Sequence, residues 1–380
     1  MGRVMTAAVL GAVLSVSFLA CTVAQASPAG ADRALDAALA RLVHARGGPL
    51  GAIAIVQRGA QTRSHAAGRA RLGGRGPSAG DAMRLASTTK AFNGAVALAL
   101  VSRRVLSLND TIGQRLRYLP AAWADVTLRE ALNHTSGLPS FTDSHSYLAA
   151  LEASPAHGPP PRQLVAFVEK KPLLFRPGTK YRYSNTDNVI AGLMAEQATG
   201  RSYEYELRRL VLRPLRLRRT ALPRTVAMSR PLLHGYQFTS SGRREDISTA
   251  INPAWTWAAG GMVSTPAELN RFARAYASGR LFSRKVHRAQ FVAVAGDSEP
   301  PGPGVNSAGL GIFRYRTRCG TVYGHTGNFP GYTQFFASSS SGQRSVTVSV
   351  NQQLRPDNAP RIFSLLLKAD TLGVCAALAR

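Results

Sequence analysis

The spacing of apolar residues predicts strands near both ends of the chain and helices between them. Leu35, Leu39 and Leu42 recur at the spacing of one helical face, whereas the apolar, β-branched run before Gly59 is typical of a strand. The elements predicted for the first part of the chain are a helix at 31–45, a strand at 51–59, its hairpin partner at 61–71, and a helix from the segment 85–92 to about Arg104.

The last part of the chain has a different pattern. Short β-rich runs separated by turn residues predict an antiparallel meander followed by a helix. The predicted strands are 309–317, 320–327, 332–339 and 344–352, and the final helix runs from about Asn358 to Leu378. The residues between about 105 and 300 are mainly helical and loop-rich, with proline-rich loops at 154–162 and 298–304.

Together these elements predict an α+β fold. The simplest arrangement is one antiparallel sheet, flanked by helices, to which both ends of the chain contribute strands. A mainly helical insertion would pack beside this sheet. We therefore expect one domain over residues 27–380, with a helical subdomain at roughly 105–300.

The first 26 residues have the pattern of a secretory signal peptide. A positive charge at Arg3 precedes an apolar stretch, and the small-x-small sequence at Ala24–Ala26 fits a cleavage site before Ser27. An uncleaved membrane anchor is the alternative, because the stretch approaches the roughly 20 residues that span a bilayer. Lipid modification of Cys21 is a third alternative. We expect a mature protein that is secreted or lies in the periplasm or cell envelope.

Removal of the signal leaves two of the three cysteines, Cys319 and Cys375. An even pair in an oxidising compartment predicts a disulfide between a late strand and the C-terminal helix. Two buried free thiols are the alternative.

The formal net charge is +27, from 47 basic and 20 acidic residues. A charge of this size favours anionic partners such as DNA, acidic lipids or cell-wall polymers. The densest basic cluster, at 208–219, interleaves arginines with apolar residues, which indicates a helix end and turn with a solvated basic face. The chain has no zinc-finger spacing or RNP-like aromatic motif. We therefore expect no nucleic-acid partner, and anionic cell-wall polymers are the more plausible attraction.

Ser87 and Lys90 are the first candidates for chemistry. Residues three apart share a helical face, so Lys90 would reach Ser87 Oγ where a helix begins and its dipole favours an anionic oxygen. A serine hydroxyl is a weak nucleophile that needs a base, and a lysine serves when burial lowers its pKa. An arginine stays protonated, so a lysine at this position is informative in a chain with six of them.

Spacing alone does not decide between chemistry and chance. With 31 serines and six lysines in 380 residues, a random S-x-x-K is close to an even bet. A serine that caps a helix, followed by a solvated lysine, is the alternative.

Two later motifs complete an ordered set. Tyr183 and Asn185 stand in "YSN", and His325, Thr326 and Gly327 stand in "HTG". With S-x-x-K before them, this order resembles the serine β-lactamase and penicillin-binding protein superfamily. Its class C-like branch, which includes secreted serine D-Ala-D-Ala carboxypeptidases and related esterases, is also similar at 132–139, 175–200, 258–269 and 323–337, and the resemblance covers residues 35 to 375.

The resemblance implies acyl transfer without a metal or organic cofactor. Ser87 would attack a carbonyl carbon and form an acyl-enzyme that water releases. Lys90 would hydrogen-bond Ser87 and Tyr183 and act as, or tune, the base, while Tyr183 serves as a phenolate or proton shuttle to the leaving group. Asn185 would orient the substrate amide and Lys90. The backbone N–H groups of Ser87 and of a residue near Asn328 would form the oxyanion hole.

The same resemblance gives the edge strand with His325, Thr326 and Gly327 the task of binding an extended substrate and helping to hold its carboxylate. His325 replaces the lysine of many relatives, so this anchor would be weaker and would depend on pH. Carboxypeptidase relatives carry an arginine in the preceding strand, where this chain has Phe313 followed by Arg314. This departure weakens the case for a substrate with a free C-terminal carboxylate.

The leading hypothesis is a secreted serine hydrolase that acts as a D-Ala-D-Ala carboxypeptidase on cell-wall peptides. A class C-like β-lactamase and an esterase share the mechanism; no class A-like glutamate motif is present, so β-lactamase turnover would run through Tyr183. A different class is a catalytically silent protein that binds penicillin or the cell wall, and the intact Ser87, Lys90 and Tyr183 argue against it. His134 is expected to bond within its turn. We expect a monomer whose substrate is a peptidoglycan peptide, a β-lactam or a small ester.

Overall fold

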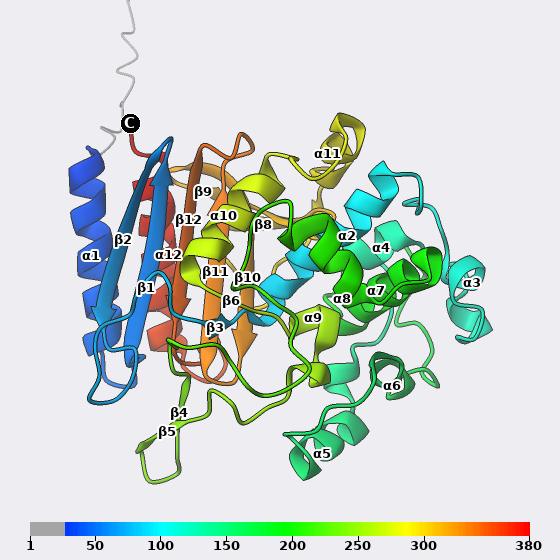
Figure 1. Ribbon diagram of the computed structural model, residues 1–380, viewed down its shortest axis with the longest axis horizontal. Helices are drawn as coiled ribbons and strands as arrows, with labels where there is room; N and C mark the ends of the chain where they lie inside the picture. The colour runs from blue at the N-terminus through cyan, green and yellow to red at the C-terminus, as the bar shows by residue number, and fades with distance from the viewer. Residues whose placement is uncertain (1–26) are drawn as a thin grey trace, which may run out of the picture.

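The computed structural model describes residues 27–380, so the predicted signal peptide and its cleavage site lie outside the described residues. Its central feature is an eight-stranded antiparallel sheet with the strand order β2-β1-β12-β11-β10-β9-β8-β7 (Figure 1). The two ends of the chain meet inside this sheet, one strand from its β2 edge, where β1 pairs with β12 and Ile53 lies opposite Ser349. The predicted α+β fold, with one sheet built from both ends, is confirmed.

The strands of this sheet match the sequence pattern except at one edge. They are β1 Gly51–Arg58, β2 Gln61–Gly68, β7 Val294–Ala295, β8 Val305–Ala308, β9 Phe313–Thr317, β10 Gly320–Phe329, β11 Tyr332–Ser338 and β12 Arg344–Val350. The edge strands β7 and β8 were not predicted, nor were the two-stranded ribbons β3 Met83–Arg84 with β6 Val263–Ser264 and β4 Tyr236–Phe238 with β5 Arg244–Asp246. Strands of two to four residues are too short to show an alternating pattern.

Helices cover both faces of the sheet, and β1 shows the consequence. Seven of its eight residues are buried, so its exposure does not alternate. Successive side chains instead join different hydrophobic cores. Ala54 and Val56 pack with the terminal helices α1 Pro28–His44 and α12 Pro360–Leu378, whereas Ile53 and Ile55 pack with the helical part on the opposite face. Helices α1 and α12 contact each other on one face, and α10 packs on β11 and β12 from the other (Figure 1).

The helical part inserts between β2 and β7 and holds a long apolar core. Its helices are α2 Thr89–Ser102, α3 Ile112–Arg115, α4 Leu128–Leu132, α5 His145–Ala153, α6 Pro161–Ala166, α7 Asn185–Thr199, α8 Tyr203–Leu207, α9 Trp257–Gly260, α10 Pro266–Ala277 and α11 Arg284–Gln290, and the terminal helices are α1 Pro28–His44 and α12 Pro360–Leu378. Helix α2 is buried on every side from Thr89 to Leu100, so it is a central core helix rather than an amphipathic one. Helix α10 lies within the range predicted as a helical subdomain yet packs on the sheet; the domain boundaries stay a prediction.

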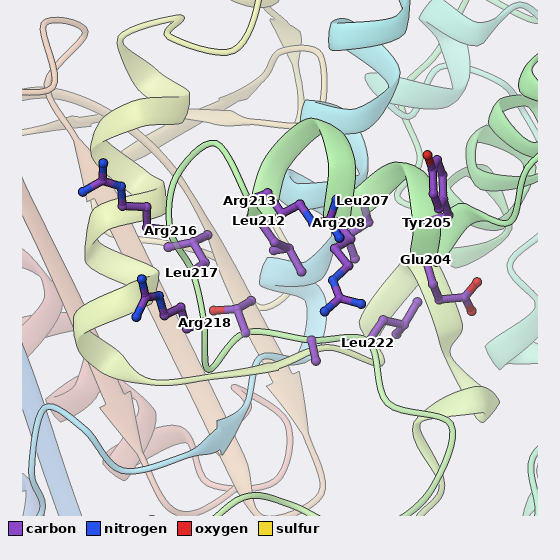
Figure 2. A pocket seen from close by; sticks show the side chains of 12 residues that line it. Glu204, Tyr205, Leu207, Arg208, Leu212, Arg213, Arg216, Leu217, Arg218 and Leu222 are labelled. Atoms are coloured by element: carbon purple, nitrogen blue, oxygen red, sulfur yellow. The ribbon is translucent and has the colours of Figure 1, made fainter.

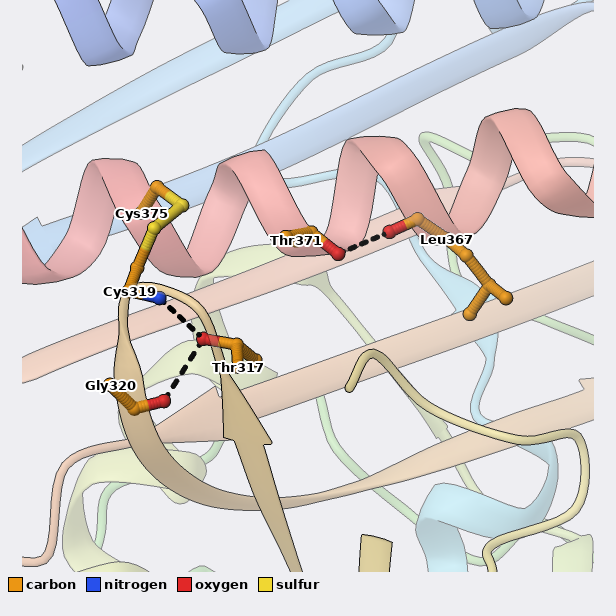
Figure 3. Close-up of a disulfide and its surroundings, with 6 residues drawn as sticks. All are labelled: Thr317, Cys319, Gly320, Leu367, Thr371 and Cys375. Atoms are coloured by element: carbon orange, nitrogen blue, oxygen red, sulfur yellow. Dashed lines mark hydrogen bonds between the residues drawn. A yellow bond between two sulfur atoms is a disulfide. The ribbon is translucent and has the colours of Figure 1, made fainter. Parts of the chain in front are cut away.

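A disulfide joins Cys319, in the turn between β9 and β10, to Cys375 in α12 (Figure 3). The two Cα atoms are 5.1 Å apart, which is within the range a disulfide spans. Thr317 fixes the turn, because its Oγ1 accepts a hydrogen bond from Cys319 N at 3.2 Å and donates one to Gly320 O at 2.9 Å. The predicted link between a late strand and the C-terminal helix is confirmed.

Over residues 27–380, none of the helices combines the length and the apolar character needed to cross a bilayer.

Candidate active site

Ser87 lies where the sheet meets the helical part, in a single 3-10 turn, η1 Ala86–Thr88, that leads directly into α2. Its hydroxyl does not cap either helix. Instead Lys90, in the first turn of α2, places Nζ 3.0 Å from Ser87 Oγ. The structure therefore places Ser87 and Lys90 together, as the nucleophile hypothesis expected, and the N-cap alternative does not hold.

Lys90 is 1 % exposed and its amine is surrounded by acceptors. Besides Ser87 Oγ, Nζ lies 2.7 Å from Asn185 Oδ1 and 2.7 Å from the carbonyl oxygen of Ala259. Burial lowers the pKa of Lys90 to about 7, although the negative charges of Glu299 and Asp187 act in the opposite direction. Near neutral pH the amine can lose a proton, and at 3.0 Å it can then accept the hydrogen bond of the Ser87 hydroxyl.

Backbone strain is concentrated around this pair. Ala86, which directly precedes Ser87, has φ 52°, and Trp257, which begins α9 two residues before Ala259, has φ 37°. A left-handed conformation costs a non-glycine residue roughly 1–2 kcal/mol. Such strain persists only where the surrounding packing imposes it, and it clusters at functional sites.

Strand β10 passes directly against the turn that carries Ser87. A Cβ built on Gly327 would lie 2.6 Å from Leu85 O and 3.1 Å from Ser87 N, so only glycine allows this approach. Strand β9 pairs with β10 no further than Gly324, so the second half of β10 is an edge on that side. Asn328 lines the cavity that contains Ser87. The predicted strand edge and the backbone groups proposed for the oxyanion hole therefore lie beside the nucleophile.

Tyr183 lies against Lys90, but not as predicted. Lys90 Nζ lies 4.9 Å from the centre of its ring, so the amine contacts the ring face and forms no hydrogen bond with the hydroxyl. Tyr183 Oη is buried and has no hydrogen-bond partner among the described residues. Burial raises the Tyr183 pKa well above its usual value, although the Ser87 hydroxyl acts in the lowering direction. Tyr183 is therefore a neutral phenol, which corrects the phenolate interpretation and leaves the proton-shuttle role open.

Asn185 begins α7 and links Lys90 to a loop of the helical part. Its Nδ2 donates to Thr142 Oγ1 at 2.8 Å while its Oδ1 accepts from Lys90. Thr142 and Ser140, whose Oγ accepts from Asn185 N at 3.1 Å, were not predicted. Both residues come just after the segment 132–139, which resembles the family. This proximity was the only feature of the sequence that could have indicated them.

His134 bonds across the structure rather than within its own turn. Its Nδ1 lies 2.7 Å from Asp187 Oδ2, and Ser136 donates to the other oxygen of the same carboxyl group. The His134 ring packs 4.4 Å from the ring of Tyr183. Burial lowers the His134 pKa to about 3 and raises the Asp187 pKa well above its usual value. Asp187 was missed, although it lies two residues after Asn185.

His325 does not act as an exposed anchor. It is 1 % exposed, and Nδ1 lies 2.6 Å from the carbonyl oxygen of Thr326. Burial lowers the His325 pKa to about 3, so the ring is neutral near pH 7 and the expected pH-dependent carboxylate contact is corrected. Thr326 Oγ1 donates to Pro300 O at 2.6 Å. Phe313 is also buried, 5.0 Å from His325 between ring centres, and Arg314 Nε donates to Ser307 Oγ at 3.0 Å.

Ser87 opens into a cavity of about 540 Å³ between the helical part and β10. Apolar and aromatic groups form one wall, including Tyr147 and Leu148 from α5 and Trp255 from the 3-10 turn η5 Pro253–Trp255. Glu299, from the loop before β8, also lines it. Glu299 was not predicted, since the proline-rich segment 298–304 reads only as a loop in the sequence.

A larger cavity of about 840 Å³ lies elsewhere, along the segment 204–222 (Figure 2). The described residues that line it include neither Ser87 nor Lys90. Its arginines, Arg208, Arg213, Arg216 and Arg218, are exposed, as predicted for a solvated basic face, and the helix end is a π-helix, η4 Arg208–Leu212. The smaller cavity is therefore the candidate active site.

Comparison with known proteins places this geometry in a family. The β-lactamase family profile matches residues 35–370. A solved D-stereospecific amidohydrolase from Streptomyces sp. is 28 % identical, with 89 % of this chain and 98 % of that chain covered and a TM-score of 0.77. The D-amino acid amidase from Ochrobactrum anthropi SV3 shares the fold at 22 % identity, with 89 % and 97 % covered and a TM-score of 0.77.

Curated relatives match over shorter segments. Penicillin-binding protein 4* of Bacillus subtilis strain 168 is 30 % identical over 128 residues, which are 31 % of this chain and 26 % of that protein. The chain thus covers between 26 % and 31 % of the length of such curated relatives. The match over residues 35–370, together with the shared fold, shows that this chain belongs to the β-lactamase family, within the β-lactamase and penicillin-binding protein superfamily.

Proposed function

We propose that the protein hydrolyses amide bonds of small D-amino-acid derivatives or peptides through an acyl-enzyme on Ser87. The position of Lys90 carries this proposal, because a buried amine with a pKa of about 7 lies 3.0 Å from the Ser87 hydroxyl. General-base assistance of this kind typically contributes a factor of about 10² to 10⁴ to a rate.

The proton path follows from these contacts. Neutral Lys90 takes the proton of Ser87 as Oγ bonds to the carbonyl carbon, and the oxyanion forms against the backbone beside Gly327. The leaving amine then takes a proton from Lys90, either directly or through the neutral phenol of Tyr183. Water attacks the ester carbonyl and gives a proton to Lys90, which returns it to Ser87 Oγ as the bond between Oγ and the acyl group breaks, so the acid product leaves and Ser87 is regenerated. No further reactant is needed.

Two observations favour amides as substrates: the activity named for a similar protein and the burial of the positions expected to bind a carboxylate. The 28 % identical protein from Streptomyces sp. is described as a D-stereospecific amidohydrolase. The two positions expected to hold a substrate carboxylate, at His325 and near Phe313, are buried. These observations favour an amidase over the D-Ala-D-Ala carboxypeptidase that the sequence suggested.

The carboxypeptidase activity stays the second candidate, because the chain is 30 % identical to part of a penicillin-binding protein. Arg355 favours it, since this arginine lines the Ser87 cavity and could face a carboxylate. Secretion, action in the cell envelope and a monomeric state remain proposals that follow from the sequence. A β-lactamase and an esterase would use the same acyl-enzyme.

A comparison of acyl donors tests the proposal. The protein without its first 26 residues is incubated separately with D-alaninamide, a peptide ending in D-Ala-D-Ala, a fluorescent penicillin and a chromogenic ester, and adducts are measured by mass spectrometry. We expect hydrolysis of D-alaninamide that disappears in Ser87→Ala. Release of terminal D-alanine with no action on D-alaninamide would favour the carboxypeptidase instead. Absence of any Ser87 adduct with every donor would refute the acyl-enzyme.

A further inference from the structure

A second cavity, of about 500 Å³, adjoins the one that contains Ser87. Both cavities are lined by Tyr183, Asn185 and Glu299, so the second is a side chamber of the candidate active site. Tyr181 and Arg182 form its other wall, together with the loop that carries residues 296–299. A substrate bound to Ser87 can therefore extend a group into this chamber.

The chamber has the opposite charge to the rest of the protein. Its lining contains three carboxyl groups, of Asp143, Asp297 and Glu299, and one basic group, of Arg182. The chain as a whole has 47 basic and 20 acidic residues. Because a cavity concentrates the field of the charges that line it, this chamber attracts cations although the protein is strongly basic.

Two of these carboxyl groups, of Asp297 and Glu299, form no ion pair with the described residues, and of the two Glu299 also lines the Ser87 cavity. Asp143 lies 3.8 Å from Arg182, and in the Ser87 cavity Asp357 lies 3.2 Å from Arg355. Within residues 27–380, the Glu299 carboxyl group forms no ion pair and accepts no hydrogen bond from another side chain. Glu299 is an exposed residue that borders both cavities, and the atoms around its carboxyl group still partly desolvate it.

The charges around Glu299 are consistent with an open position for a cation. Crowding raises the Glu299 pKa, and Asp143 raises it further, whereas Lys90 and Arg182 act in the lowering direction. The attraction of the two basic groups therefore does not compensate for the effect of desolvation on the Glu299 pKa. A ligand ammonium at this place would supply the missing counter-charge.

An unpartnered oxygen beside Glu299 points to the same kind of ligand. Tyr183 is 94 % buried and lines both cavities, and its Oη completes no hydrogen bond among the described residues, although the Ser87 hydroxyl lies close enough to lower its pKa. A phenol oxygen can accept a hydrogen bond from an ammonium while it keeps its own proton. Glu299 and Tyr183 together thus offer one charge and one acceptor to a cationic group.

We propose that Glu299 binds a free ammonium group of the substrate next to the scissile amide, and so selects amino-acid amides and peptides with a free amine over N-acylated ones. This inference rests on the proposed amide hydrolysis and names its substrate class. It also separates the two candidate activities, because the unpaired carboxylate attracts an ammonium and repels the free carboxylate of a peptide terminus.

Paired substrates test the proposal. Values of kcat/KM are measured for D-alaninamide and N-acetyl-D-alaninamide with the wild type and with Glu299→Gln, which keeps the shape and removes the charge. We expect the wild type to prefer D-alaninamide and the preference to fall about tenfold in the variant, as for loss of a hydrogen bond to a charged group. Glu152→Gln, a change of the same kind at an exposed position of α5, should leave the preference unchanged.

A binding measurement keeps this inference distinct from the proposed function. In the Ser87→Ala background, calorimetry compares the Kd of D-alaninamide with and without Glu299→Gln, and no catalysis is required. Weaker binding of D-alaninamide in the double variant supports the ammonium site even if the wild type hydrolyses neither amide. An unchanged Kd, or an unchanged kcat/KM preference, would overturn it even if Ser87 proves to be the nucleophile.

Discussion

Gly327 and Ser87 approach so closely that no side chain fits between them: a Cβ at position 327 would lie 3.1 Å from the Ser87 amide nitrogen. Leu85 O would be closer still, at 2.6 Å, and both are backbone atoms that a rotamer change cannot move. The contact sets the distance between the nucleophile and the strand that is proposed to bind substrate. The missing side chain therefore sets how closely β10 approaches Ser87, where we propose the oxyanion hole.

Gly327→Ala should consequently lower kcat/KM about 100-fold, because displacements of this size at a reacting centre have such effects. The fold should persist, since β10 keeps its pairing with β11. Hydrolysis of a chromogenic ester and circular dichroism check the two parts. Gly76→Ala is the matched control, because its Cβ would meet the nearest atom at an ordinary 3.5 Å. Normal activity in Gly327→Ala would show that the strand does not set the geometry at Ser87.

The sequence predicted those parts of the fold in which local pattern and burial agree. Runs of four or more β-formers became β1, β9, β11 and β12, and apolar helical spacing became α1 and α12. The edge strands β7 and β8 could not be predicted, because two to four residues are too few to show an alternation of apolar and polar side chains. They are strands because β8 pairs with β9 and β7 pairs with β8.

At the candidate active site, too, the sequence predicted the residues that lie in motifs and missed those that depend on packing. The motifs led to Ser87, Lys90, Tyr183 and Asn185, which the fold brings together. Motif order does not state which face of β10 a residue occupies or how deeply it is buried, so it could not predict that the His325 ring is buried and neutral. Glu299 comes from a loop between two short strands, and its position depends on packing that no periodic pattern encodes.

Lys90→Arg tests whether Lys90 accepts a proton rather than only supplying charge. Arginine stays protonated, so we expect kcat/KM for acylation to fall by about 10³, within the range of general-base effects. Because arginine is larger and the site is buried, Lys90→Met is measured beside it, with thermal unfolding of both. Loss of activity in both variants with retained cooperative unfolding supports the base. Near-normal acylation by Lys90→Arg would exclude it.

The disulfide should stabilise the protein through its unfolded state. Cys319 and Cys375 are 56 residues apart, and closing a loop of that length is worth about 4 kcal/mol by chain entropy. We expect the double change Cys319→Ser and Cys375→Ser to lower the free energy of unfolding in urea by up to about 4 kcal/mol, with acylation retained because the bond joins a turn and α12 away from Ser87. A reductant should destabilise the wild type and leave the double variant unaffected. Equal stability of the two proteins would mean that the bond is not formed in solution.

The pH dependence of acylation reports the protonation of Lys90. Its pKa in the folded protein is about 7, lowered by burial from 10.5, and the neutral amine is the reactive form. Activity should therefore be low well below pH 7 and rise as pH increases through the Lys90 pKa. His325, with a pKa of about 3, is neutral throughout this range and contributes no limb.

Glu299 should shift this profile in a known direction. Its negative charge raises the Lys90 pKa, so Glu299→Gln removes a stabilising charge from the protonated amine. The midpoint of kcat/KM against pH, measured with a neutral ester so that substrate charge plays no part, should move to lower pH in Glu299→Gln. It should stay in place in Glu152→Gln, which lies on the exposed side of α5. A midpoint that moves to higher pH, or does not move, would mean that the limb belongs to a group other than Lys90.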